Sequence, residues 1–170
     1  MSCESNGFCR VFVTSTTQNG NLGGIAGADM ICQNLADASM MTQGSTYRAW
    51  VSDSIGNSPN TTFYQANVPY QLLDGTQVAA NYSGLIQAPQ MNLDNEIEID
   101  ETGADNDGSS FVWTGTDGDG SSTGDNCNNW GVATDQSEGT AGFNGVADMR
   151  WTNFQEITCE TLRRLYCFEQ

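Results

Sequence analysis

Residues 24–36 carry the sequence GIAGADMICQNLA, and this stretch decides the fold. Its apolar residues recur at three- and four-residue spacing, which is the pattern of an amphipathic helix. We therefore predict a helix over residues 25–38. Cys32 lies on the apolar face of that helix, so we expect its side chain to point into the core.

Strand-like segments surround this helix in the chain. Residues 10–15 (RVFVTS) are β-branched and aromatic, and residues 47–52 (YRAWVS) alternate as a half-buried strand does. Residues 111–114 (FVWT) and 165–168 (LYCF) predict two further strands. Residues 63–86 fit neither a helix nor a strand pattern clearly.

The composition narrows the classes of function. The chain has 170 residues, which fits one domain over residues 1–170, and its formal net charge is −16. Twenty-one acidic residues face five arginines, with no lysine and no histidine. Such a surface repels nucleic acids and anionic membranes. The usual general base near neutral pH is also missing, so we expect no enzyme.

The cysteines favour disulfides over a metal site, because their number is even and no CxxC pair occurs. They are Cys3, Cys9, Cys32, Cys127, Cys159 and Cys167. Disulfides place the domain outside the cell or on the cell surface. Within residues 1–10, an Asn-Gly pair between the first two cysteines predicts a small cystine-closed hairpin.

The ends and the hydropathy suggest an excised domain. No signal peptide follows Met1, which we take as the start of that domain. No apolar run approaches the ~20 residues that span a bilayer, so we expect no membrane insertion.

Residues 92–130 predict a long acidic loop region, interrupted by the strand at 111–114. Ten acidic residues lie between Asp94 and Asp125, with no arginine among them. Loops of this length in compact domains are usually functional. We expect this region to present the functional surface.

The order of these elements resembles the C-type-lectin-like superfamily: a strand, a cysteine-bearing helix, a tryptophan-bearing strand, a long polar loop and a final cysteine-bearing strand. Several runs are similar to a bacterial surface-protein family of unknown function that lies close to the endostatin branch of that fold. These runs are VFVTS at 11–15, GGIAGAD at 23–29, AWVSDS at 49–54, WTGT at 113–116 and LYCF at 165–168.

The resemblance implies an α+β fold with small antiparallel sheets, one or two helices, a long polar loop region and three disulfides. It implies the pairs Cys32 with Cys167 and Cys127 with Cys159, and Cys3 with Cys9 as an additional N-terminal bridge. It also implies ligand recognition, although the family itself brings no known activity.

The acidic loop offers ligands for Ca²⁺, because Asp-x-Asp-Gly clusters supply carboxylates on a backbone that can curl. Sugar-binding C-type lectins use a Glu-Pro-Asn motif that this chain lacks. The candidate metal ligands are Asp105, Asp107, Asp117, Asp119, Asp125 and Asn153. The alternative is a solvated acidic surface that keeps the protein soluble.

Asn128, Asn129 and Trp130 are the candidate ligand-binding residues, since Trp130 is the tryptophan with the most loop-like surroundings. We expect an extracellular recognition or adhesion module whose ligand is a glycan or a protein. Ca²⁺ is a candidate cofactor for the binding of that ligand. The alternative is a structural or self-assembly domain, a homo-oligomer with Ca²⁺-bridged contacts.

Overall fold

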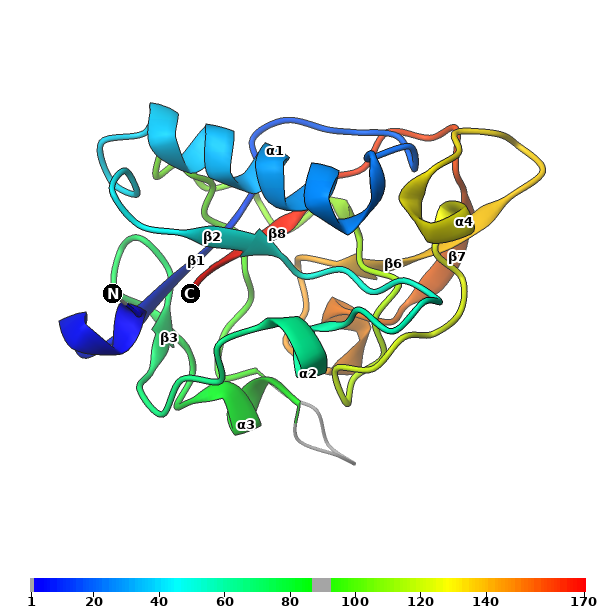
Figure 1. Ribbon diagram of the computed structural model, residues 1–170. Helices are drawn as coiled ribbons and strands as arrows, with labels where there is room; N and C mark the ends of the chain where they lie inside the picture. Colours follow the sequence, from blue (N-terminus) through cyan, green and yellow to red (C-terminus); the bar gives the residue numbers. More distant parts are fainter. Residues whose placement is uncertain (1, 87–92) are drawn as a thin grey trace.

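The computed structural model describes residues 2–86 and 93–170 and has a mixed α+β architecture (Figure 1). Met1, taken above as the start of an excised domain, and Asn92, the first residue of the expected acidic loop, lie outside the described residues. Two small sheets and one long helix make up the fold, as expected for its class.

The helix predicted from residues 25–38 is confirmed as α1, Gly24–Ala38. Its core-facing residues are Ala28, Cys32 and Ala36, one helical turn apart. Gly23 precedes the helix with a left-handed backbone (φ 83°), which glycine adopts without steric cost. In the described ranges, no helix has both the length and the apolar character that crossing a membrane requires.

The larger sheet has the strand order β2-β8-β1-β3-β4. Its strands are β1 (Cys9–Val13), β2 (Tyr47–Ala49), β3 (Tyr70–Gln71), β4 (Gln77–Ala79) and β8 (Tyr166–Glu169). The pairs are antiparallel except β1 with β3, which is parallel. The expectation of antiparallel sheets is therefore wrong for this one pair, because the long connection through α1 and β2 brings β3 alongside β1 in the same direction.

The β1–β8 pair at the centre of this sheet is buried on both faces. Val11 and Val13 contribute to one apolar cluster, whereas Phe12 between them contributes to a second cluster on the opposite face. Successive strand side chains point to opposite faces, so a continuous apolar run suits such a strand. Trp50 belongs to the first cluster, and Cys32 of α1 belongs to the second.

The smaller sheet is antiparallel with the order β5-β6-β7, and its strands are β5 (Phe111–Trp113), β6 (Glu138–Phe143) and β7 (Gln155–Thr158). Short helical turns complete the fold: η1 (Cys3–Asn6), α2 (Pro59–Thr62), α3 (Tyr82–Leu85), α4 (Cys127–Trp130) and η2 (Met149–Trp151). The predicted acidic loop region thus contains β5 and ends in α4.

All three expected disulfides are present: Cys3–Cys9, Cys32–Cys167 and Cys127–Cys159. The hairpin expected in residues 1–10 is wrong, because this segment forms the 3-10 turn η1. The Gly7 amide donates to the Glu4 carbonyl at 2.9 Å, and Gly7 has φ 80°. The backbone therefore coils inside the small ring, and β1 pairs with β3 and β8 instead.

We expect the variant Cys32→Ala, Cys167→Ala to lose on the order of 5 kcal/mol of unfolding free energy, because this bridge closes a 135-residue separation. The matched variant Cys3→Ala, Cys9→Ala opens a six-residue separation and should lose about 2 kcal/mol. Urea unfolding followed by circular dichroism measures both. Equal losses in the two variants would contradict this account of the fold.

Candidate functional site

The backbone of α4 is left-handed over four consecutive non-glycine residues. The φ angles of Cys127, Asn128, Asn129 and Trp130 are 52°, 53°, 57° and 60°. The Trp130 amide donates to the Asn126 carbonyl at 2.7 Å, so the segment is a single hydrogen-bonded turn of left-handed helix. This conformation costs about 1–2 kcal/mol for each L-residue, and asparagine is one of the non-glycine residues that adopt it most readily.

Buried contacts impose this left-handed turn. Trp130 is fully buried, and its Nε1 donates to the Ser52 carbonyl at 2.8 Å. At the other end, Cys127 is equally buried and is tied to Cys159. The Asn126 side chain caps the turn by accepting from the Asn129 amide at 2.9 Å.

Glycines make room for the packing of the turn. A Cβ atom on Gly20 would lie 2.3 Å from the Cys127 Sγ, and one on Gly115 would lie 2.8 Å from the Trp130 ring. Side chains at these positions would displace the disulfide or the indole. The surrounding core therefore fixes the turn from several sides.

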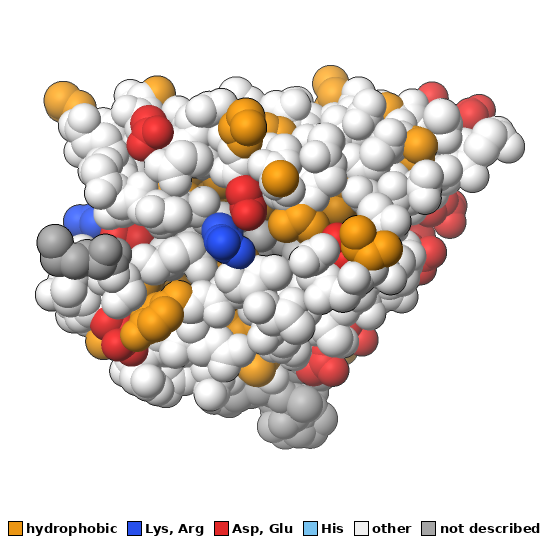
Figure 2. Space-filling model, viewed as in Figure 1, with side chains coloured by type: hydrophobic (Ala, Val, Ile, Leu, Met, Phe, Trp, Pro, Cys, Tyr) orange, Lys and Arg blue, Asp and Glu red, His pale blue; other side chains and the backbone are white. Residues whose placement is uncertain are grey.

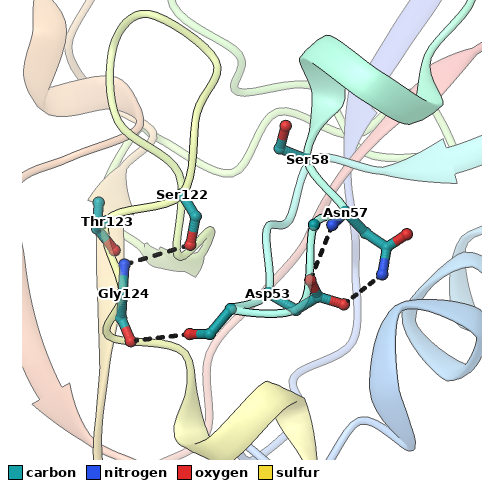
Figure 3. Close-up of a pocket in the computed structure, with 8 residues that line it drawn as sticks. Asp53, Asn57, Ser58, Ser122, Thr123 and Gly124 are labelled. Atoms are coloured by element: carbon teal, nitrogen blue, oxygen red, sulfur yellow. Dashed lines mark hydrogen bonds between the residues drawn. The ribbon is translucent and has the colours of Figure 1, made fainter.

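A first polar hollow of about 420 Å³ lies beside this turn, between residues 53–58 and residues 122–124 (Figure 3). Ser54 Oγ reaches across it and donates to the Gly124 carbonyl at 3.5 Å. The Asn126 Nδ2 donates to the same Ser54 hydroxyl at 2.8 Å. Neutral amide, hydroxyl and backbone groups thus dominate its walls.

Asp53 is the one carboxylate in the walls of the first hollow, and it organises the 53–58 loop. Its Oδ1 accepts from the amide of Ile55 at 3.0 Å. Figure 3 shows its two bonds to Asn57, in which Oδ1 accepts from the amide at 2.9 Å and Oδ2 accepts from Nδ2 at 2.6 Å. Asp53 is only 4% exposed. Because these three hydrogen bonds and burial occupy the carboxylate, few of its acceptor positions are open to a ligand.

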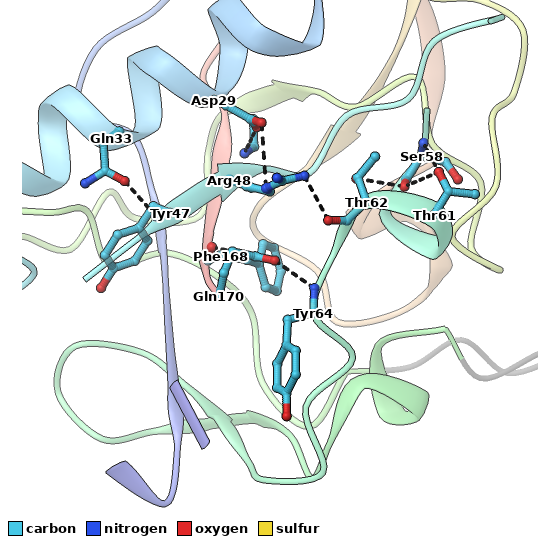
Figure 4. A network of polar contacts seen from close by, with 11 residues as sticks. Asp29, Gln33, Tyr47, Arg48, Ser58, Thr61, Thr62, Tyr64, Phe168 and Gln170 are labelled. Carbon is cyan, nitrogen blue, oxygen red and sulfur yellow. Dashed lines mark hydrogen bonds and ion pairs between the residues drawn. The ribbon is translucent and has the colours of Figure 1, made fainter. Parts of the chain in front are cut away.

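A second hollow of about 400 Å³ lies on the other side of the 53–58 loop and reaches the first turn of α1. Arg48 crosses its floor: the Nε lies 4.0 Å from an Asp29 oxygen, and an Nη donates to the Thr62 carbonyl at 2.8 Å (Figure 4). Burial raises the pKa of Asp29. Asn129 also lines this hollow.

The three predicted ligand-binding residues have different outcomes. The Asn129 Oδ1 accepts from the Ser54 amide at 2.8 Å, and Asn128 is exposed. Trp130, chosen for its loop-like surroundings, is instead fully buried, because its indole fills space left by Gly115 and Gly139. The sequence predicted no site residue in the 53–58 loop, although the AWVSDS run at 49–54 leads into it.

The predicted calcium ligands do not converge. Across residues 2–86 and 93–170, no three Asp, Glu, Cys or His side chains are grouped so that they could hold a metal ion. Asn153 meets Asp117, but through its Nδ2, which donates at 3.0 Å. Asp105 accepts from the Asp107 amide, and Asp119 accepts from the Ser121 amide, each within its own turn. Asp125 is exposed.

Acidic side chains are nevertheless crowded on the surface. In the view of Figure 2 they gather along the right-hand edge, beside α4 and β7. Elsewhere, Glu98 lines a small hollow of about 150 Å³ together with Asp74, Glu96 and Asp105. Burial raises the pKa of Glu98, and repulsion by Asp105, Glu96 and Asp107 raises it further.

The fold and this site define a disulfide-linked α+β domain with a left-handed turn next to the 53–58 loop and its two hollows. Residues 15–149 match the family described as Protein of unknown function (DUF1554), and the chain belongs to that family. The match includes the 53–58 loop and the left-handed turn. A search of curated proteins finds no match to this chain.

We expect the free energy of unfolding of Asn128→Val to be about 1–2 kcal/mol lower than that of Asn128→Gly, because a β-branched residue is disfavoured at φ 53° and glycine is not. Asn34, exposed in the right-handed helix α1, is the matched control. There the order should reverse, since glycine is the poorer helix former. Urea midpoints measure all four variants, and the same order at both positions would refute the left-handed turn.

Glu98→Gln should raise the melting temperature at pH 7. The raised pKa of Glu98 means that the folded state disfavours the charged carboxylate. The folded state therefore gains stability as the pH falls toward the pKa that Glu98 has in the unfolded state. The advantage of the variant should vanish below about pH 4, where both states are protonated. Glu160→Gln, at an exposed position, controls for net charge. Equal gains in the two variants would exclude local repulsion at Glu98.

Proposed function

We propose that this domain is an extracellular recognition module that binds a neutral, hydroxyl-rich ligand of the glycan class. The ligand would occupy the two hollows on either side of the 53–58 loop. The observation that carries this proposal is the left-handed turn, whose partly exposed Asn129 lines the second hollow and whose preceding residue, Asn128, is exposed.

The backbone cost of the turn supports a functional role. Residues in sparsely populated backbone regions cost about 1–3 kcal/mol each and cluster at binding sites, where the surrounding structure sets them in advance. Here a disulfide, a buried indole and an asparagine cap act on one turn. Such pre-organisation lowers the entropy lost when a ligand binds.

The hollow walls suit hydroxyl groups. The side-chain amides of Asn57 and Asn129 offer donors and acceptors, and the serine and threonine hydroxyls offer both as well. The Asp53 carboxylate already accepts three hydrogen bonds. A neutral polyol matches these groups better than an anion, which the net charge of −16 repels.

The same features favour recognition over catalysis. The chain contains no histidine and no lysine, so the proposed site would have to find its base among carboxylates. Three disulfides support a location outside the cytoplasm. The element order and the disulfide pairing also support the C-type-lectin-like fold as part of this proposal.

In this proposal Ca²⁺ would bind at the acidic loop formed by residues 117–125, because residues 122–124 of that loop line the first hollow. One or two carboxylates there would need backbone and amide oxygens to complete a coordination shell. Ligand binding compared in Ca²⁺ and in chelator tests this part separately.

A glycan array probed with the labelled domain should give specific hits. For the best hit, Asn129→Ala and Asn128→Gly should each weaken binding about tenfold, the loss expected when one hydrogen-bonding side chain of a rigid site is removed. Asn128→Gly keeps the left-handed backbone, so its loss isolates the side chain. Asn34→Ala on α1 should bind as the unaltered domain does.

A blank array, both with Ca²⁺ and with chelator, would overturn the proposal. Hits that are unaffected by both site variants would also overturn it. Concentration-dependent oligomers together with a blank array would favour the self-assembly alternative.

A further inference from the structure

Two arginines and two phenylalanines form a continuous row outside the proposed binding site. The Arg150 Cζ lies 5.9 Å from the centre of the Phe154 ring, and the Arg163 Cζ lies 5.4 Å from the centre of the Phe111 ring. The two rings are stacked, with centres 5.9 Å apart and planes inclined by 19°. We call Arg150, Phe154, Phe111 and Arg163 the Arg–Phe row.

The row and the neighbouring Arg164 hold most of the chain's arginines, and one of them, Arg150, is paired with Asp148 at 2.6 Å. Three of the five arginines lie at positions 150, 163 and 164, in a chain with 21 acidic residues. Arg164 braces the region, since its Nε donates to the Ser110 hydroxyl at 3.0 Å and its Nη1 donates to the Thr14 carbonyl.

Arg163 lacks a carboxylate partner. In the part of the chain that the structure describes, Arg10, Arg48 and Arg150 form ion pairs, whereas Arg163 forms none. Its Nε is buried without a hydrogen-bond acceptor, and burial lowers its pKa. The chain has about four acidic residues for every arginine, so carboxylates are abundant. Arg163 is unpaired because the fold places none of the described carboxylates within reach of its guanidinium.

Exposed apolar side chains belong to the Arg–Phe row or precede its arginines in the chain. Phe154 is 40% exposed, Leu162 is 57% exposed and Met149 is 41% exposed. Leu162 precedes Arg163 in the chain, and Met149 precedes Arg150. A surface that combines an unpaired arginine with exposed aromatic and aliphatic groups has the composition of an interface centre.

We propose that the Arg–Phe row is a docking surface for an acidic segment of a partner protein that also carries apolar side chains. A carboxylate of the partner would pair with the Arg163 guanidinium, which the Phe111 ring holds in place. Its apolar residues would cover Phe154 and Leu162. The acidic remainder of the surface repels such a segment, so charge complementarity directs it to this row.

Fluorescence anisotropy of the whole domain with a labelled peptide of sequence ELDFE tests the proposal. We expect binding that weakens at least about fivefold in Arg163→Gln and that also weakens between about 50 and about 300 mM NaCl. The isosteric peptide QLNFQ should bind at least about fivefold more weakly than ELDFE. Asn34→Asp, which changes the net charge equally on α1, should leave binding unchanged.

Absence of ELDFE binding to the folded domain would overturn the proposal, as would equal binding by Arg163→Gln. Phe154→Ser provides a second variant at an exposed ring, and it should weaken binding without replacing the arginine. Self-association of the domain that depends on Arg163, seen by sedimentation, would instead assign the surface to a second copy of this chain.

Discussion

The β1–β8 pair, tied to α1 by the Cys32–Cys167 disulfide, is the constraint on which the rest of the structure depends. Because both strands are buried on both faces, they belong to two apolar clusters at once. Trp50 and Trp151 pack in one cluster in a tilted arrangement, with ring centres 4.9 Å apart. Trp113 and Trp130 meet in the other cluster at 5.9 Å. The central pair thereby connects the two halves of the core.

The second cluster connects the core to the surface. Trp130 and Cys127 are core residues, yet the backbone between them emerges as the left-handed turn that exposes Asn128. Burial of an indole and a disulfide offsets the cost of the left-handed conformation. The position of the polar turn is thus set by apolar packing. In the proposed function, the same packing sets the geometry of the binding site.

Local pattern was enough to predict part of this structure. The spacing of apolar residues predicted α1, and β-branched and aromatic runs predicted β1, β2, β5 and β8. The disulfide pairs followed from family resemblance and not from spacing. The parallel β1–β3 pair and the burial of Trp130 depend on contacts between residues far apart in the chain. The 3-10 turn at Cys3 is local, because the Gly7 amide donates to the Glu4 carbonyl inside the small disulfide ring. The left-handed turn carries no local signal beyond its two asparagines.

The central claim is that the left-handed turn and the 53–58 loop together bind a hydroxyl-rich ligand. Nitrogen-15 NMR of the domain, titrated with neutral oligosaccharides, tests this claim most directly. The account predicts that the side-chain amide signals of Asn57, Asn128 and Asn129 shift together and saturate. Saturable shifts confined to other parts of the molecule, or no shifts with any neutral oligosaccharide, would contradict it.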